Sequence, residues 1–215
     1  MNRRPQPPQR HGNDRDRGLA LVEMALVAPL LALLMAGIVE YGMLWRDNLT
    51  VTSSTRAAAR VVSNLGDNNL ADYEALLSLD AGLGAIDGYT VEYVMVYDAS
   101  AGDGAPSATC FDGNGDPRVN SGGNCNVYTG AQVDSMAALV CEPSCASFPS
   151  LADAADCAGG LTFDFCPQAE RPTDQHGGLS SIGVWVRLTR DYFTGMFPGD
   201  GITMEDYSVM KVEPR

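Results

Sequence analysis

One uninterrupted apolar run near the start of the chain restricts the possible folds more than any other feature. Residues 19–39 are LALVEMALVAPLLALLMAGIV, with a single charged side chain, Glu23. As a helix rising about 1.5 Å per residue, this run is roughly 32 Å long and can cross the core of a bilayer. It is longer than the apolar part of a typical secretory signal, and no good A-x-A cleavage site closes it. Hydropathy predicts a membrane-anchored protein and leaves its type open.

The distribution of charge predicts the orientation of this segment. The residues before Gly18 carry five arginines and two aspartates, so the remainder of a chain with net charge −13 carries −16. A small basic flank beside an apolar segment is typical of the cytoplasmic side of a membrane span. The acidic remainder has none of the basic patches that nucleic acid requires, so we expect no nucleic-acid partner.

The cysteines indicate the compartment of the remaining chain. All of them follow the apolar segment, at Cys110, Cys125, Cys141, Cys145, Cys157 and Cys166. An even number of cysteines confined to the translocated part is typical of an oxidising compartment. The alternative is a metal site, but no C-x-x-C pair is present and the two histidines lie far from any cysteine pair in sequence. We therefore favour disulfides, with their connectivity open, and expect neither metal nor cofactor.

The apolar segment continues into an amphipathic helix. Apolar or small residues recur at alternating spacings of four and three, which places them on one helix face: Leu44, Val51, Ala58, Val62 and Leu65, with Asn48 and Thr55 in the same stripe. Gly66 then offers a C-terminal cap. Three regions follow: a basic leader at 1–18, a long helix at 19–66, and an extracytoplasmic domain at 67–215.

The domain at 67–215 has the pattern of an α+β fold. We expect short helices at 71–79 and 132–139, strands at 89–97, 182–190 and 202–213, a short strand at 161–165, and a long Gly/Asn/Asp-rich loop at 98–130. Three or four antiparallel strands would leave one apolar face to be covered. The amphipathic half of the long helix is the predicted cover.

The apolar segment contains one carboxylate, Glu23, whose position bears on function. Glu23 follows Gly18 by five positions, and a charge within a bilayer costs a few kcal/mol unless it finds a partner. Cleavage after Gly18 would create an α-amino group on Leu19, and that amine on a neighbouring subunit could pair with Glu23. The alternative is an anchor helix whose glutamate reaches back to the cytoplasmic interface. The spacing leaves both interpretations open.

Three segments together resemble the start of TadE-like proteins, which are pseudopilins of tight-adherence (Flp, type IVb) pilus systems. The segments are the Arg17-Gly18 junction before LALVE, the stretch GIVEYG at 37–42, and TRAAAR at 55–60. The family usually has an aromatic residue after the glutamate, where this chain has Met24. The resemblance covers about residues 17–62. It implies cleavage by a prepilin peptidase and a minor-pilin role, with other pilin subunits, an inner-membrane assembly platform and membrane lipid as partners.

A calcium-like spacing occurs in the loop at 98–130, but it is a weak signal. Asp112, Asn114 and Asp116 resemble the opening of a calcium loop, but Pro117 and Gly123 occupy positions that need Gly and Glu, so a solvated turn is the better interpretation. No catalytic constellation is recognisable, and we expect no enzyme. The alternative to a pilin-like subunit is a stand-alone membrane-anchored adhesin or ligand-binding domain that uses the loop at 98–130.

Overall fold

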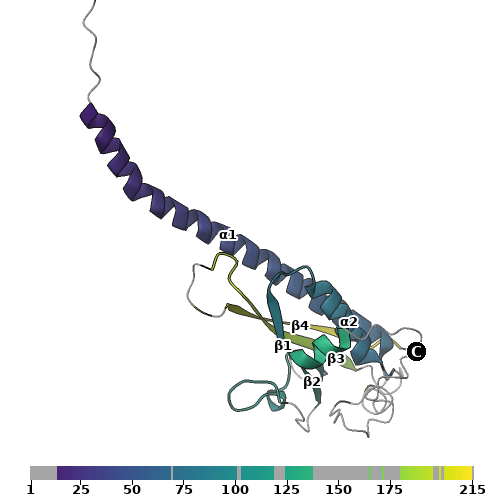
Figure 1. Cartoon of the computed structure of the whole chain (residues 1–215). Helices are drawn as coiled ribbons and strands as arrows, with labels where there is room; N and C mark the ends of the chain where they lie inside the picture. Colours follow the sequence, from purple (N-terminus) through teal and green to yellow (C-terminus); the bar gives the residue numbers. More distant parts are fainter. Residues whose placement is uncertain are drawn as a thin grey trace, which may run out of the picture. The chain divides into compact units, whose positions relative to one another are not determined.

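The computed structural model describes residues 14–68, 70–100, 103–118, 124–137, 165, 171, 180–195, 199 and 201–214, with residues 14–17 and 135–137 described by their backbone alone. The elements in chain order are α1 (Asp14–Leu65), α2 (Ala71–Leu83), β1 (Tyr89–Asp98), the short 3-10 helix η1 (Ala108–Cys110), β2 (Cys125–Thr129), α3 (Gly130–Ala137), β3 (Ser181–Arg190) and β4 (Ile202–Lys211) (Figure 1). The chain divides into two compact units, residues 1–43 and 44–215, which are described separately.

The described residues of the first unit, 14–43, form the beginning of α1. The helix starts at Asp14, five residues before the predicted Leu19, and continues through Pro29. At its other end α1 stops at Leu65, and Gly66 takes a φ of 53° there while its N–H bonds the carbonyl of Val62 at 2.9 Å. The predicted glycine cap is confirmed.

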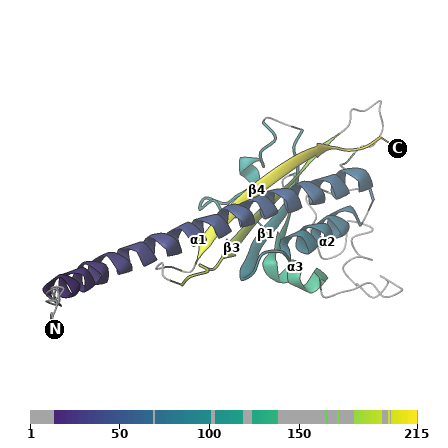
Figure 2. The ribbon, with the colours of Figure 1, turned by 90° about the horizontal axis from the view of Figure 1, so that it is seen from above.

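The second unit is built on a four-stranded antiparallel sheet in the order β2-β1-β3-β4. Figure 2 shows strands β1, β3 and β4 of this sheet. The predicted α+β class is confirmed, as are strands at β1, β3 and β4. The prediction of an unbroken loop at 98–130 is wrong, because β2 lies within it. The Gly/Asn/Asp-rich stretch ends just before Cys125, and the five residues CNVYT pair with β1 from Tyr93 to Tyr97. The predicted strand at 161–165 falls outside the described residues except for Phe165.

The second half of α1 covers one face of the sheet, as predicted. Val51, Thr55, Ala58 and Val62 are buried, and three of them join a single apolar core with side chains of α2, β1, β3 and β4. Burying a valine side chain is worth about 1.5–3 kcal/mol, so this stripe anchors the helix. Asn48 was placed in the stripe wrongly, since it is exposed. Its neighbour Asp47 is buried instead.

The opposite face of the sheet has its own small core. Met95, Tyr97 and Trp185 pack there with the disulfide between Cys110 and Cys125. A side chain at Gly183 would collide with the Tyr97 ring, so this strand position requires glycine. The Tyr97 hydroxyl donates to the carbonyl of Gly104 at 2.7 Å, which fixes the connecting loop over the sheet.

The Cys110–Cys125 bond confirms disulfide formation for one of the three expected pairs. The other four cysteines, Cys141, Cys145, Cys157 and Cys166, lie outside the described residues. The observed bond joins η1 to the first residue of β2, and so holds the edge strand that sequence reasoning missed.

Removing this disulfide should weaken the second unit. Cross-linking residues 15 positions apart restricts the unfolded chain, which is expected to contribute about 3 kcal/mol. We therefore expect Cys110→Ser with Cys125→Ser to lower the free energy of unfolding by about that amount in urea titration of the full chain in detergent. A loss below about 1 kcal/mol would show that the bond does not support the sheet edge.

Candidate assembly interface

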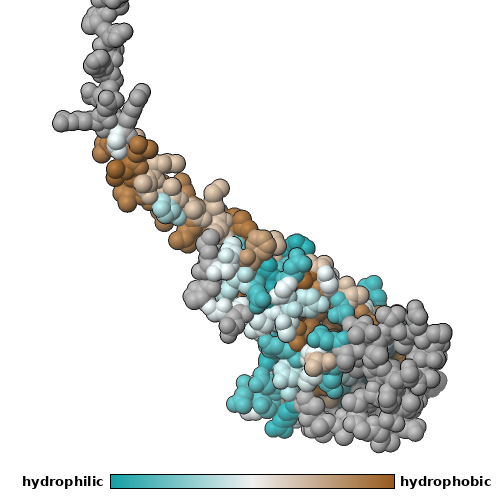
Figure 3. Space-filling view, viewed as in Figure 1, coloured by the Kyte–Doolittle hydropathy of each residue, from teal (hydrophilic) through white to brown (hydrophobic). Residues whose placement is uncertain are grey.

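The apolar part of α1 has almost no buried surface within the structure. Leu19, Leu21 and Leu26 are 70%, 72% and 74% exposed, and none of the most apolar window is buried. Figure 3 shows hydrophobic residues along this part of the helix. An exposed apolar surface of this extent marks a membrane or protein contact. Within the described part of the chain, α1 is the one helix long and apolar enough to cross a membrane.

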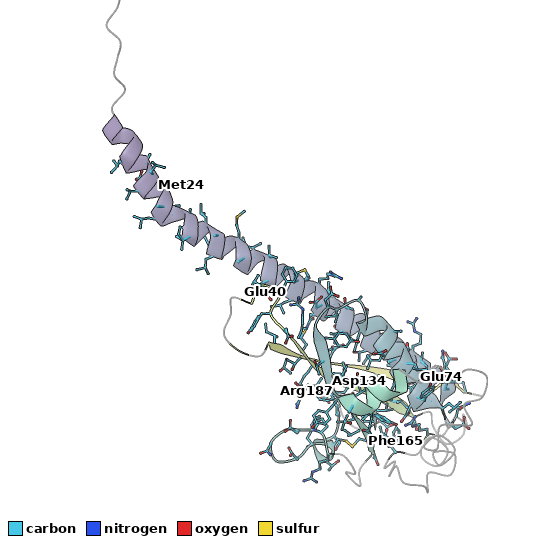
Figure 4. All side chains as sticks on the ribbon, in the orientation of Figure 1. Met24, Glu40, Glu74, Asp134, Phe165 and Arg187 are labelled. Carbon is cyan, nitrogen blue, oxygen red and sulfur yellow. A yellow bond between two sulfur atoms is a disulfide. The ribbon has the colours of Figure 1, made fainter. Side chains whose placement is uncertain are left out.

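The predicted processing and assembly residues lie in the first turns of this exposed segment. Gly18 is exposed, and a side chain added there would meet nothing within 4 Å. Leu19 and Glu23 are four residues apart in a continuous helix, which places them one turn apart on the same side. Glu23 is exposed, and so is its neighbour Met24, which is labelled in Figure 4. The structure thus presents the Glu23 carboxylate on a surface open to another subunit.

A buried ion pair fastens the second half of α1 to the sheet. The Nε of Arg190, at the end of β3, lies 2.7 Å from a carboxylate oxygen of Asp47, and both side chains are at most 3% exposed. Sequence reasoning missed Asp47. The available signal was its position one turn before Val51, on the stripe that packs against the sheet.

A second buried polar cluster forms around Asp72 on α2. Its carboxylate accepts hydrogen bonds from the Asn126 side-chain amide at 2.8 Å and the Tyr128 hydroxyl at 2.8 Å, both on β2. The Arg171 guanidinium binds the same carboxylate at 2.6 and 3.1 Å. Burial, followed by the charge of Asp72, raises the pKa of Tyr128 well above its ordinary value, so its hydroxyl remains a donor. We call these residues the Asp72 cluster.

Phe165 connects the Asp72 cluster to the region between α3 and β3. Its N–H donates to the side-chain carbonyl of Asn126 at 2.9 Å, and its carbonyl accepts from the same amide at 2.9 Å and from Arg171 at 3.1 Å. Arg171 also stacks over the Phe165 ring, 4.5 Å from its centre. The sequence predicted a short strand ending at Phe165 but offered no signal for its contacts with Arg171 and Asn126.

The three calcium candidates form a turn rather than a converging ligand set. The Asp112 carboxylate accepts from the backbone N–H groups of Asn114 at 2.8 Å and Asp116 at 2.9 Å. These hydrogen bonds, with that from Asp116 the strongest, lower the pKa of Asp112. The Asp116 carboxylate binds Arg187 at 2.7 Å. In the part of the chain that the structure describes, no three His, Cys, Asp or Glu side chains are arranged to hold a metal ion.

Arg187 ties this turn to the sheet. Besides Asp116 it binds Glu205 on β4 at 2.6 Å, and its guanidinium lies 5.2 Å from the centre of the Trp185 ring. Partial burial lowers the pKa of Arg187, but the hydrogen bonds and charges of Glu205 and Asp116 together outweigh it, so the pKa is raised. The exposed turn is therefore held by a side chain that bridges two strands.

Comparison with known protein families agrees with the interpretation of the first helix. Residues 18–60 match the model of the TadE-like protein family. This match confirms the resemblance predicted from the sequence motifs over that segment, and supports association with a tight-adherence pilus. Searches of curated proteins and of solved structures each returned no match.

The Asp72 cluster predicts a large effect from one substitution. Arg171→Ala removes one partner of a buried ion pair and leaves the Asp72 carboxylate undercompensated, which typically costs about 3–5 kcal/mol. Urea unfolding should show this loss. Arg118→Ala, at an exposed position, is the matched control and should change stability by no more than about 0.5 kcal/mol. Equal effects of the two changes would contradict the structural role of the cluster.

Proposed function

We propose that this chain is a pilin-like subunit, a minor pilin or pseudopilin, of a tight-adherence pilus system, cleaved after Gly18. The observation that carries the proposal is the exposed apolar segment of α1 that begins directly after Gly18. Glu23 is the fifth residue of this segment, which lies within the match to the TadE-like family. An ordinary core helix would bury such side chains, whereas an assembling membrane helix needs them at its surface.

The proposed chemistry begins with removal of the basic leader by a prepilin peptidase. Hydrolysis of the Gly18–Leu19 peptide bond releases residues 1–18 and leaves an α-amino group on Leu19. That amine is cationic near neutral pH and can pair with the Glu23 carboxylate of a neighbouring subunit. Pairing offsets the cost of holding either charge in an apolar surrounding. The same pair would set the axial register between adjacent helices.

The second unit, residues 44–215, is called the outer unit from here on. It has the properties that a position outside the cytoplasmic membrane requires. The Cys110–Cys125 disulfide suits an oxidising compartment, and the basic leader suits the cytoplasmic side of the membrane. The proposal therefore places residues 67–215 outside the cytoplasmic membrane, with the inner-membrane assembly platform and other pilins as partners. The family match begins at Gly18 and includes the apolar helix, which supports a pilin-like role. A stand-alone adhesin would need only an apolar anchor in this segment.

Substitution of Glu23 tests the assembly role. Glu23→Ala should leave the processed protein in the membrane with its outer unit folded, because the helix becomes more apolar. It should lower pilus output and cross-linking to other pilins by more than about tenfold, because the amine of Leu19 loses a partner worth about 3–5 kcal/mol. Met24→Ala, at a position 61% exposed, is the control and should leave both readouts unchanged.

If Glu23 only reaches toward the cytoplasmic interface, the outcome differs. Glu23→Ala then removes a costly charge from the bilayer, so protein level holds or improves. Normal piliation and normal cross-linking in the Glu23→Ala strain would contradict the proposed assembly mechanism. This holds even if the protein is still cleaved after Gly18.

A further inference from the structure

The second half of α1 carries a shallow groove that nothing within the described structure fills. The groove has a volume of about 290 Å³ and is lined by Leu49, Thr52, Ser53, Arg56, Ala57 and Arg60. We call it the basic groove. Its lining combines the small exposed side chains of Ser53 and Ala57 with two exposed arginines, Arg56 and Arg60, one helical turn apart. The groove borders the edge of the sheet, because its residues Thr52 and Arg56 interact with Asp206 on β4.

The two arginines are exceptional in a strongly acidic unit. Residues 44–215 carry 23 Asp or Glu against nine Lys or Arg, a formal charge of −14. Arg171, Arg187 and Arg190 are engaged in ion pairs. Arg56 interacts electrostatically with Asp206 on β4, and Arg60 forms no ion pair with the described residues. The basic groove is thus a local positive site that complements the acidic surface of the same protein.

The outer face of α2 has the complementary composition. Glu74, Ser78 and Ala81 recur at spacings of four and three and form a stripe that is exposed at Glu74 and Ala81 and half-buried at Ser78. The Glu74 carboxylate (Figure 4) makes no ion pair with the described residues. We call this set the α2 stripe. One carboxylate followed by small side chains can approach another helix closely.

We propose that the basic groove of one copy of this chain receives the α2 stripe of a second copy, with Glu74 paired to Arg60. At about 1.5 Å per residue the groove from Leu49 to Arg60 is roughly 16 Å long and the stripe from Glu74 to Ala81 roughly 10 Å, so the stripe fits within the groove. Because the two surfaces differ, the contact is heterologous and can repeat from copy to copy. Two outer units that each carry a net charge of −14 repel each other at long range. The attraction between Arg60 and Glu74 therefore favours the one orientation in which these two side chains meet.

This contact is separate from the pairing of Glu23 with Leu19. It lies wholly in the outer unit and requires neither cleavage after Gly18 nor the apolar helix for its chemistry. Loss of one contact therefore leaves the other measurable.

Photo-cross-linking in the membrane tests the proposal with the full chain. Two differently tagged copies are co-expressed, and the first carries benzoylphenylalanine at Leu49, a large apolar position that is 56% exposed at the end of the groove. We expect an adduct between the two tags, with the cross-link mapped by mass spectrometry to the peptide 71–83. Arg60→Glu in the first copy should lower the adduct yield roughly two- to five-fold, as expected for an exposed ion pair.

A charge exchange between copies gives the decisive comparison. Glu74→Arg in the second copy alone should lower the yield, and Arg60→Glu in the first with Glu74→Arg in the second should restore it. Arg118→Glu in the first copy is the control, because it makes the same charge change at an exposed position outside the groove. Cross-linking to a different protein, a cross-link outside 71–83, no adduct, or a double exchange that fails to restore the yield would each overturn the proposal.

Discussion

The long helix α1 has to satisfy two environments with one backbone, and the rest of the structure follows from that constraint. Over its first half the side chains are apolar and exposed, so this segment requires lipid or other helices around it. Over its second half a single stripe of small and apolar residues is buried against the sheet. Ala58 and Ala59 are fully buried in this face, where their small side chains allow close packing. The outer unit can thus form around a helix that also serves the membrane.

Buried charges fix how the pieces of the outer unit fit together. The pair of Asp47 with Arg190 joins α1 to the end of β3, and the Asp72 cluster joins α2, β2 and the region containing Arg171. Burying such pairs costs desolvation energy, so they contribute less to stability than apolar packing would. A wrong arrangement would leave a charge without a partner, which is far more costly. These contacts therefore specify one packing among many apolar alternatives.

The sequence predicted the elements whose formation depends mainly on residues close together in the chain. Helix α1, its glycine cap at Gly66, and strands β1, β3 and β4 follow from periodicity and β-branched composition, because each element buries one regular face. Strand β2 was missed because only five residues pair there and a disulfide supports them. The ion pairs of Asp47 with Arg190 and of Arg171 with Asp72 join residues far apart in sequence, and no window of neighbouring residues can reveal such pairings. The contacts of Asp112 with backbone N–H groups and of Asp116 with Arg187 likewise could not be read from the spacing of these residues in the sequence.

Intact-mass measurement of the protein extracted from membranes, without reduction, tests the central claim most directly. The account predicts a chain that starts at Leu19, lacking residues 1–18, with two hydrogens fewer for each disulfide. Treatment with a reductant should restore those hydrogens and leave the first residue unchanged. A mass that retains the leader, or one that corresponds to a start after Val39, would contradict the assignment of this chain as a processed, pilin-like subunit.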